Sequence, residues 1–241
     1  MNELFDYLST ADNWWGRQGI VRALYDHVRL SGLATLIAVV IAVPPAVVLG
    51  HARRGGFLAV SVVNIGRAMP SFAILALVFP LSLRYGFGLG FWPTAVALVL
   101  LAVPPIFTNA YTGVRDVDPG VVGAATGMGM SARQVLAQVE VPNAVPLIVT
   151  GVRIAAVQVV ATATLGALFG FGGLGALITK GYAQQDNGKL LTGALFVALL
   201  AVVTEVAFGA LERRLTPWAG RRPDPSQLSV TAPDPPSVLA T

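Results

Sequence analysis

Long apolar runs constrain the fold of this 241-residue chain more than any other feature of its sequence. Residues 30–50 carry no charge, and only 12% of the whole chain is charged, against about 25% in an ordinary soluble domain. A helix needs roughly 20 apolar residues to cross a bilayer. We therefore predict an all-α, polytopic membrane protein. Five transmembrane helices are expected, at residues 30–50, 57–83, 86–112, 145–169 and 190–211.

The distribution of arginine predicts how these helices are oriented. An odd number of spans places the two ends of the chain on opposite sides of the membrane. Arginines follow the first, third and fifth spans, at Arg53, Arg54, Arg115, Arg133, Arg213, Arg214, Arg221 and Arg222. Because loops rich in Lys and Arg stay in the cytoplasm, we expect the C-terminus inside and the N-terminus outside. The chain would then be a multi-pass protein of the inner, or cytoplasmic, membrane.

The two ends of the chain differ in composition from the apolar middle. Residues 1–28 mix charged residues with Trp14, Trp15 and Tyr25, and such aromatic residues favour the membrane–water interface. These residues are predicted to form an extracytoplasmic or interfacial arm, for which an amphipathic surface helix is one possible form. Residues 217–241 are rich in Pro and have little apolar surface to bury. They are predicted to form a disordered cytoplasmic tail.

A structured segment separates the third and fourth apolar runs, at residues 115–144. Asp118-Pro119 is typical of a helix start, with Asp as the N-cap and Pro as the first helical residue. The small residues Ala124 and Ala125 would let another surface approach this helix closely. Gly127 and Gly129 should end it, because Gly tolerates the positive φ of a helix C-terminus. The sequence therefore predicts a short helix followed by a glycine hinge.

A second helix is predicted directly after the hinge. Ser131 and Gln134 stand at the spacing of a capping box. An apolar face would consist of Val135, Leu136 and Val139, with Arg133, Gln134 and Gln138 pointing elsewhere. Pro142 is expected to close this helix. Physical reasoning alone leaves two alternatives open for the whole segment, a well-formed cytoplasmic linker or a docking surface for a cytoplasmic partner.

The spacing of these residues resembles the EAA loop of ABC importer permeases. That loop reads E-A-A, three residues, G, nine residues, I-x-L-P, and Ala124-Ala125, Gly129 and Val139–Pro142 stand at the matching positions. Gly123 departs from the pattern, because the family usually has Glu there. The segment Val63–Leu75 also resembles the N-x-x-R-x-x-P-S segment of such permeases. Residues 139–175 are similar to permeases of the osmoprotectant group, which import glycine betaine, carnitine, choline and proline betaine.

This resemblance implies a MetI-like fold, a permease domain at residues 29–216, and a set of partners. The partners would be a second permease chain, two cytoplasmic ABC ATPase subunits, an extracytoplasmic solute-binding protein and membrane lipid, with no nucleic acid. ATP and Mg would be bound by the ATPases, so this chain is expected to be non-catalytic and to hold no cofactor of its own. The residues implied in ATPase coupling are Gly123, Ala124, Ala125, Gly127, Gly129, Ser131, Arg133, Val139 and Pro142.

Two other functions stay open at this stage. The same fold could import another small solute, such as methionine or another amino acid. From a different class, the chain could be a self-contained secondary carrier, although no inverted repeat, which many such carriers have, is visible in its sequence.

Charged residues inside the apolar runs are candidates for gating or for lining a path. Arg67 lies within the second run, where a charge costs about 2.5–3.5 kcal/mol on insertion scales, so it needs a partner or water. Asn64 lies one turn away, and Pro70 is a candidate pivot because proline kinks a helix. Arg67 could instead be a structural pair or extend to the interface. Glu205 is expected to pair with Arg67 or Arg153.

The fourth run offers two further polar candidates and a glycine-rich end. Gln158 and Thr162 are four residues apart and share one helix face. They would either line the path or form interhelical hydrogen bonds. The glycine-rich stretch at residues 169–175 should leave the helix, as a short re-entrant segment or as a plain loop.

Catalytic or metal chemistry has little support in the sequence. The chain has no Cys, and its two histidines, His27 and His51, are expected on different sides of the membrane. Residues 181–189 resemble a phosphate-binding loop only superficially, because Ala183 stands where that motif requires Gly. No metal site is therefore predicted, and ATP hydrolysis would come from another chain.

Overall fold

The computed structural model describes residues 2–16, 18–54, 56, 61 and 70–217, and this part of the chain is helical without strands. Two short elements, α1 (Asn2–Ser9) and η1 (Ala11–Asn13), precede the first long helix, and α4 (Ser71–Arg84) comes between the first and second long helices in the chain. The long helices are α2 (Ile20–His51), α5 (Phe91–Arg115), α8 (Val141–Thr162) and α10 (Asn187–Leu215). The remaining elements are α6 (Pro119–Gly127), α7 (Ala132–Val135), the π-helical turn η2 (Leu136–Glu140), the 3₁₀ segment η3 (Ala163–Phe169) and α9 (Gly173–Gln184).

Four of the described helical stretches are long and apolar enough to cross a membrane: Ile20–His51, Phe91–Arg115, Ala132–Phe169 and Asn187–Leu215. The helix α4 is apolar but shorter, and it covers only the second half of the predicted span at residues 57–83. Most of the first half lies outside the described residues. The all-α membrane class is therefore confirmed, whereas the count of five spans stays a prediction.

The first long helix begins at Ile20, not at Leu30 as predicted. Charge alone does not end a helix, and the ion pair between Arg22 and Asp26, at 3.0 Å and four residues apart, suits an α-helix. No glycine or proline interrupts residues 20–29 to break the hydrogen-bonding pattern. The separate part of the predicted arm is therefore limited to α1, η1 and the turn before Gly19, the N-cap residue of α2.

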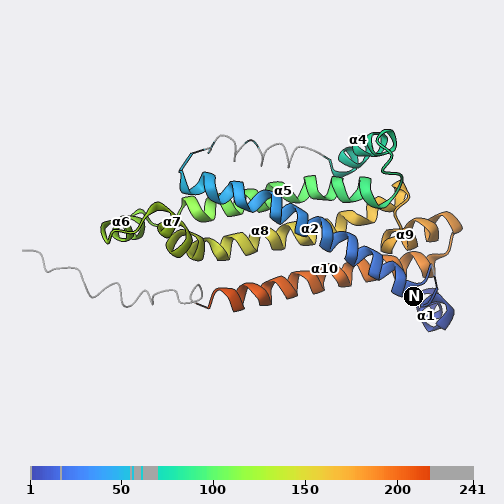
Figure 1. Cartoon of the computed structure of the whole chain (residues 1–241). Helices are drawn as coiled ribbons and strands as arrows, with labels where there is room; N and C mark the ends of the chain where they lie inside the picture. Colours follow the sequence, from blue (N-terminus) through green and yellow to red (C-terminus); the bar gives the residue numbers. More distant parts are fainter. Residues whose placement is uncertain (1, 17, 55, 57–60, 62–69, 218–241) are drawn as a thin grey trace, which may run out of the picture.

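The long helices lie side by side and have two distinct ends (Figure 1). The helices α6 and α7 project from one end, together with the C-terminal ends of α2 and α10. The helices α1, α4 and α9 lie at the other end. The segments after the first, third and fifth predicted spans thus share one end, as the arginine distribution requires.

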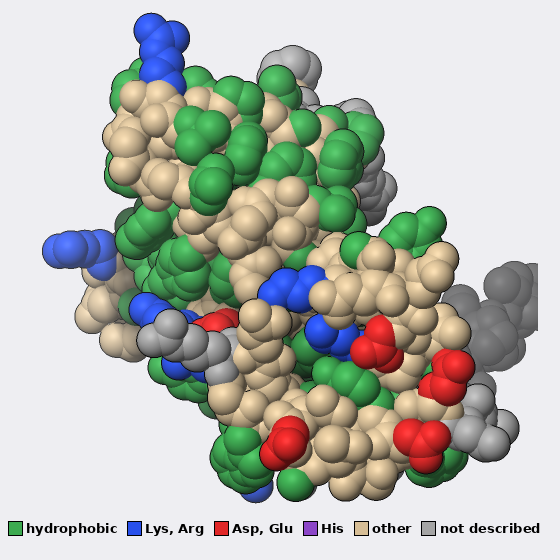
Figure 2. Space-filling model, turned by 90° about the vertical axis from the view of Figure 1, so that its right-hand side faces the viewer, with side chains coloured by type: hydrophobic (Ala, Val, Ile, Leu, Met, Phe, Trp, Pro, Cys, Tyr) green, Lys and Arg blue, Asp and Glu red, His purple; other side chains and the backbone are tan. Residues whose placement is uncertain are grey.

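Figure 2 shows the opposite end, which carries α1, α4 and α9. Acidic and basic side chains gather over its lower half, and its upper half, on the side of α4, is mainly hydrophobic. On this surface Lys180 of α9 donates a hydrogen bond to Gln18, at 3.3 Å. The charged part has the polar character that an aqueous face requires.

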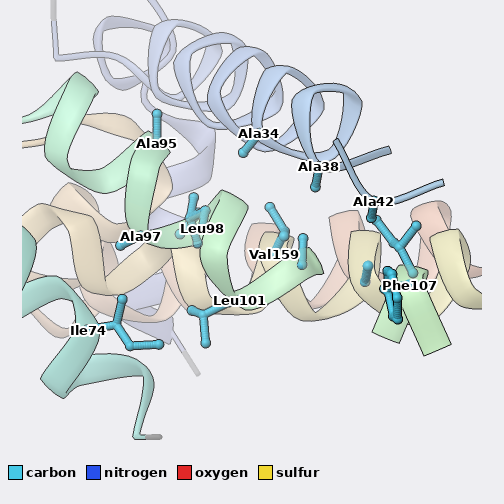
Figure 3. Close-up of a cluster of buried hydrophobic side chains, with 14 of the residues drawn as sticks. Ala34, Ala38, Ala42, Ile74, Ala95, Ala97, Leu98, Leu101, Phe107 and Val159 are labelled. Carbon is cyan, nitrogen blue, oxygen red and sulfur yellow. The ribbon is translucent and has the colours of Figure 1, made fainter. Parts of the chain in front are cut away.

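Small residues bring α2, α5 and α8 into close contact at the centre of the bundle. Ala34, Ala38, Ala42 and Ala46 recur every fourth residue along α2, and all are buried. Figure 3 shows Ala34, Ala38 and Ala42 on the side of α2 that is turned toward α5, with Ala42 next to Phe107. Hydrocarbon tails are as apolar as leucine, so close packing by small residues is what holds helices together in a membrane.

The glycine-rich end of the fourth span is a turn that leads into a helix. Gly170 has φ +85°, which ends η3 in the left-handed conformation. The helix α9 then begins at Gly173. Residues 170–172 are therefore a short loop, and residues 173–175 form the first turn of α9. A re-entrant position in the membrane stays a prediction.

Candidate functional site

The helix α6 begins as its sequence predicts. The carboxylate of Asp118 accepts a hydrogen bond from the backbone N–H of Gly120 at 2.6 Å, and Pro119 occupies the first helical turn. The cap satisfies one backbone donor that has no partner within the helix. This fixes where α6 starts after the end of α5.

Gly129 forms the hinge between α6 and α7. Its φ is +87°, in the left-handed region that glycine tolerates best. The N–H of Gly129 donates to the carbonyl of Thr126 at 2.9 Å, and the N–H of Met130 donates to that of Ala125 at 3.2 Å. These two bonds are the Schellman pattern of a helix end. The angle between α6 and α7 is therefore set by one left-handed glycine.

One side of α6 is an open surface made of small residues. Gly123, Ala124 and Gly127 are exposed, and a Cβ added to Gly123 or Gly127 would meet no atom within 4 Å. Met128, which follows the helix, is 78% exposed. Ala125 faces inward and is buried. The pair Ala124-Ala125 thus has one residue in the packed interior and one available to a partner.

The start of α7 also agrees with its prediction. The side-chain oxygen Oε1 of Gln134 accepts from the backbone N–H of Ser131 at 2.8 Å and from its hydroxyl at 2.9 Å. Val135 is buried, and Val139 is half-buried. Arg133, like Gln134, is exposed. The predicted apolar face of α7 is therefore confirmed, and Arg133 lies on the solvent-exposed side.

Pro142 does not close this helix, so that prediction is wrong. Helical structure runs without interruption from Ala132 to Phe169. The turn before the proline is widened to a π-helix, in which the N–H of Val141 donates to the carbonyl of Leu136, five residues earlier. A proline cannot donate to the residue four positions before it, and the wider turn accommodates its ring. Pro142 therefore falls at the start of α8.

The widened turn carries a buried acid that the sequence did not reveal. Glu140 is 3% exposed, and its carboxylate accepts a hydrogen bond from Nδ1–H of His51 at 2.5 Å. His51 is the last residue of α2. The only local signal is an acid between two valines, Val139 and Val141, since the two partners are 89 residues apart in sequence.

The candidates for the path are only partly tested. Asn64 and Arg67 lie outside the described residues. Pro70 is exposed and forms the N-cap of α4. Gln158 is exposed on α8, Thr162 is half-buried, and neither side chain bonds to another described residue. Interhelical hydrogen bonds within the described chain therefore do not explain the polar face of α8, and its role in a path stays a prediction.

Glu205 pairs with Arg153, one of the two partners that the sequence predicts for it. Nε of Arg153 lies 3.5 Å from the Glu205 carboxylate. Sequence reasoning missed Glu212, which accepts a closer bond from Arg153, at 3.1 Å, and another from the hydroxyl of Thr150, at 3.3 Å. Such intramembrane charges are expected to pair with one another. These contacts join α8 to α10.

Within residues 2–16, 18–54, 56, 61 and 70–217, no three His, Asp or Glu side chains come together as a metal site would require.

Comparison with known proteins identifies the group to which these features belong. Residues 30–217 match the family described as "Binding-protein-dependent transport system inner membrane component". The chain is 38% identical to the carnitine transport permease protein OpuCB of Listeria monocytogenes, over 82% of this chain and 88% of that protein. It is 36% identical to the choline transport system permease protein OpuBB of Bacillus subtilis, over 82% of this chain and 89% of that protein.

A solved structure shares the fold. The inward-facing MetNI methionine ABC transporter superposes with a TM-score of 0.70 at 24% identity, over 82% of this chain and 96% of the matched chain. The MetI-like fold that the EAA-like loop implied is therefore confirmed. Because the family match covers residues 30–217, which include α5, α8, α10, most of α2 and the whole α6–α7 segment, this chain belongs to the family of inner-membrane components of binding-protein-dependent transport systems.

Proposed function

We propose that this chain is the permease subunit of an ATP-driven importer of osmoprotectants, with quaternary ammonium solutes such as carnitine, choline and glycine betaine as its cargo. The observation that carries the proposal is the similarity to OpuCB and OpuBB, at 38% and 36% identity, each over 82% of this chain. Carnitine and choline, for which those relatives are named, share a trimethylammonium group. Because both relatives are named for solutes that carry this group, their similarity to this chain favours the same class of solute as its cargo.

The open face of α6 and the exposed Arg133 are the proposed docking surface for the ATPase subunits. They lie on the segment that projects from one end of the bundle (Figure 1). Small residues such as Ala124 let a partner approach the backbone closely. ATP binding would draw the two ATPases together and move α6 and α7 with them. The ATPases would hold ATP and Mg.

The remaining partners follow from the same proposal. A second permease chain, identical or paralogous, would complete the path, and an external binding protein would deliver the solute at the end that carries α1 and α9. In this proposal the N-terminus would lie outside and the C-terminus in the cytoplasm. A reporter fused after Leu215 should be protected from protease in intact cells and cleaved in inside-out vesicles.

Uptake by reconstituted complexes tests the function. The permease would be purified with its ATPase and, where one is required, its paralogue, and placed in liposomes with the binding protein outside and ATP inside. We expect uptake of radiolabelled choline or carnitine that requires ATP. Uptake of methionine in their place would support the amino-acid alternative. Uptake driven by an ion gradient without ATPase subunits would support a secondary carrier and refute the proposal.

A further inference from the structure

We infer that the hydrogen bond between Glu140 and His51 makes α2 move together with the ATPase-docking segment, by which we mean residues 118–140, comprising α6, α7 and η2. The inference rests on the function proposed above and assigns a positioning role to two residues outside the exposed docking surface. Glu140 follows α6 and α7 in the chain, whereas His51 ends a helix that crosses the whole bundle (Figure 1).

The position of Glu140 depends on the π-helical turn. The bond from the N–H of Val141 to the carbonyl of Leu136 spans five residues instead of four, so the turn contains one residue more than an α-helical turn. The extra residue rotates α7, which precedes the turn, about the helix axis relative to α8. Glu140 is buried in this turn, while Gln138, two residues earlier, is exposed. Single π turns inside α-helices are frequently found at functional sites.

Close helix contacts connect the same region to α5. A Cβ added to Gly50, next to His51, would lie 2.9 Å from the carbonyl oxygen of Tyr111. A Cβ added to Gly113 would lie 3.1 Å from Leu147 and 3.2 Å from Ala144. The ends of α2, α5 and α8 are therefore packed almost backbone to backbone. Motion of the docking segment can reach α8 through the chain and α5 through this packing.

The Glu140–His51 bond joins the last residue of α2 directly to the docking segment, and a longer bond of 3.5 Å runs nearby from Arg53, just after α2, to the carbonyl of Val117, just before α6. The Glu140–His51 bond is directional, because a hydrogen bond from Nδ1 to a carboxylate fixes the orientation of the imidazole. The carboxyl side chain is 4% exposed and the imidazole 29% exposed. A buried pair of this kind adds little to stability compared with apolar residues of the same size. Its presence at this position is better explained by the geometry that it fixes.

Four variants separate a positioning role from a structural one. Glu140→Leu and His51→Leu each remove one partner, and the double variant removes both without leaving a buried charge. Glu140→Gln keeps a side-chain oxygen that can accept from the imidazole. His27→Leu is the matched control, because His27 is also buried on α2 and bonds to the Val160 carbonyl at 2.9 Å, near the opposite end of the bundle.

The readout is solute transported per ATP hydrolysed by the reconstituted complex, together with copurification of the ATPase. We expect each single Leu variant to lower this ratio about tenfold, the factor that corresponds to losing one hydrogen bond to a charged group. The double variant should lower it by the same factor, because two residues that act as one unit are not additive. The Gln variant and the His27→Leu control should keep the ratio, with the ATPase still bound in every case.

Three results would overturn the inference. The first is an unchanged ratio in the double variant, which is the variant that carries the test if the single Leu variants fail to assemble. The second is an equal loss in His27→Leu, because the effect would then reflect general packing of α2. The third is a hundredfold loss in the double variant, which would make the two residues independent. Absence of ATP-dependent uptake in the wild type would instead refute the proposed function and the inference with it.

Discussion

The conformation of Gly129 gives the most direct prediction about ATPase docking. A Cβ added at this position would meet no atom within 4 Å, so a substitution meets no steric obstacle within the chain. Its cost is confined to the backbone, because φ is +87° and an L-residue pays about 1–2 kcal/mol in the left-handed region. That cost corresponds to roughly a 5- to 30-fold change in an equilibrium constant.

Gly129→Ala should therefore weaken ATPase binding by about 5- to 30-fold, since the binding-competent angle between α6 and α7 becomes less populated. Gly129→Asn should weaken it less, although Asn is larger, because Asn tolerates the left-handed conformation better than Ala. Gly127→Ala adds a methyl group to the docking face without changing the hinge, and it should weaken binding less than Gly129→Ala. Gly127 has equally open surroundings and lacks the positive φ, and alanine favours a helix by up to about 1 kcal/mol over glycine.

The assay is the dissociation constant of the purified ATPase for the permease in lipid nanodiscs. The reasoning would be refuted if Asn weakened binding more than Ala, because side-chain size would then be the cause. An equal effect of Gly127→Ala and Gly129→Ala would also contradict it, since crowding of the docking surface would explain both.

Two further predictions concern the contacts of α8 with its neighbours. Gly151→Ala should lower the unfolding temperature in detergent, because the added Cβ would lie 2.6 Å from the Asn109 side chain of α5. Overpacking of this kind costs about 1–3 kcal/mol. The control Gly123→Ala adds its Cβ in open space and should not lower the unfolding temperature. Glu212→Gln should destabilise the chain more than Glu205→Gln, because Glu212 lies closer to Arg153, at 3.1 Å against 3.5 Å, and its side chain is 26% exposed against 52%. We expect roughly 1–2 kcal/mol for the first and under about 1 kcal/mol for the second, and equal unfolding midpoints would contradict this order.

Local signals explain why the docking segment could be predicted from the sequence. The Asp118 cap, the left-handed Gly129 and the Ser131–Gln134 bonds each involve residues within a few positions of one another. Caps and hinges of this kind depend on backbone groups that have no partner inside the helix, and so on nearby side chains. The same locality made the apolar face of α7 predictable from its periodicity.

The error at Pro142 and the missed side-chain pairs have different causes, the first local and the second not. Pro142 was expected to end a helix because proline lacks a backbone donor, but the π turn before it accommodates the ring and lets the helix continue. The pairs formed by Glu140 with His51 and by Glu212 with Arg153 join residues that are 89 and 59 positions apart. A single sequence does not specify which distant helices meet, so these partners could not be named in advance.

The described bundle uses two kinds of helix contact, and they suit different tasks. The helices α2, α5 and α8 touch through small residues such as Ala38 and Gly151, and backbones in such close contact cannot shift far without clashing. The helix α10 has no buried residue in its most hydrophobic stretch, and within the described part of the chain its side-chain bonds to α8 are those of Glu205 and Glu212. Long polar side chains can keep a bond through small displacements. A force applied at α6 should therefore reach α8 through the chain and α5 through this packing, while the Glu140–His51 bond transmits it directly to the end of α2.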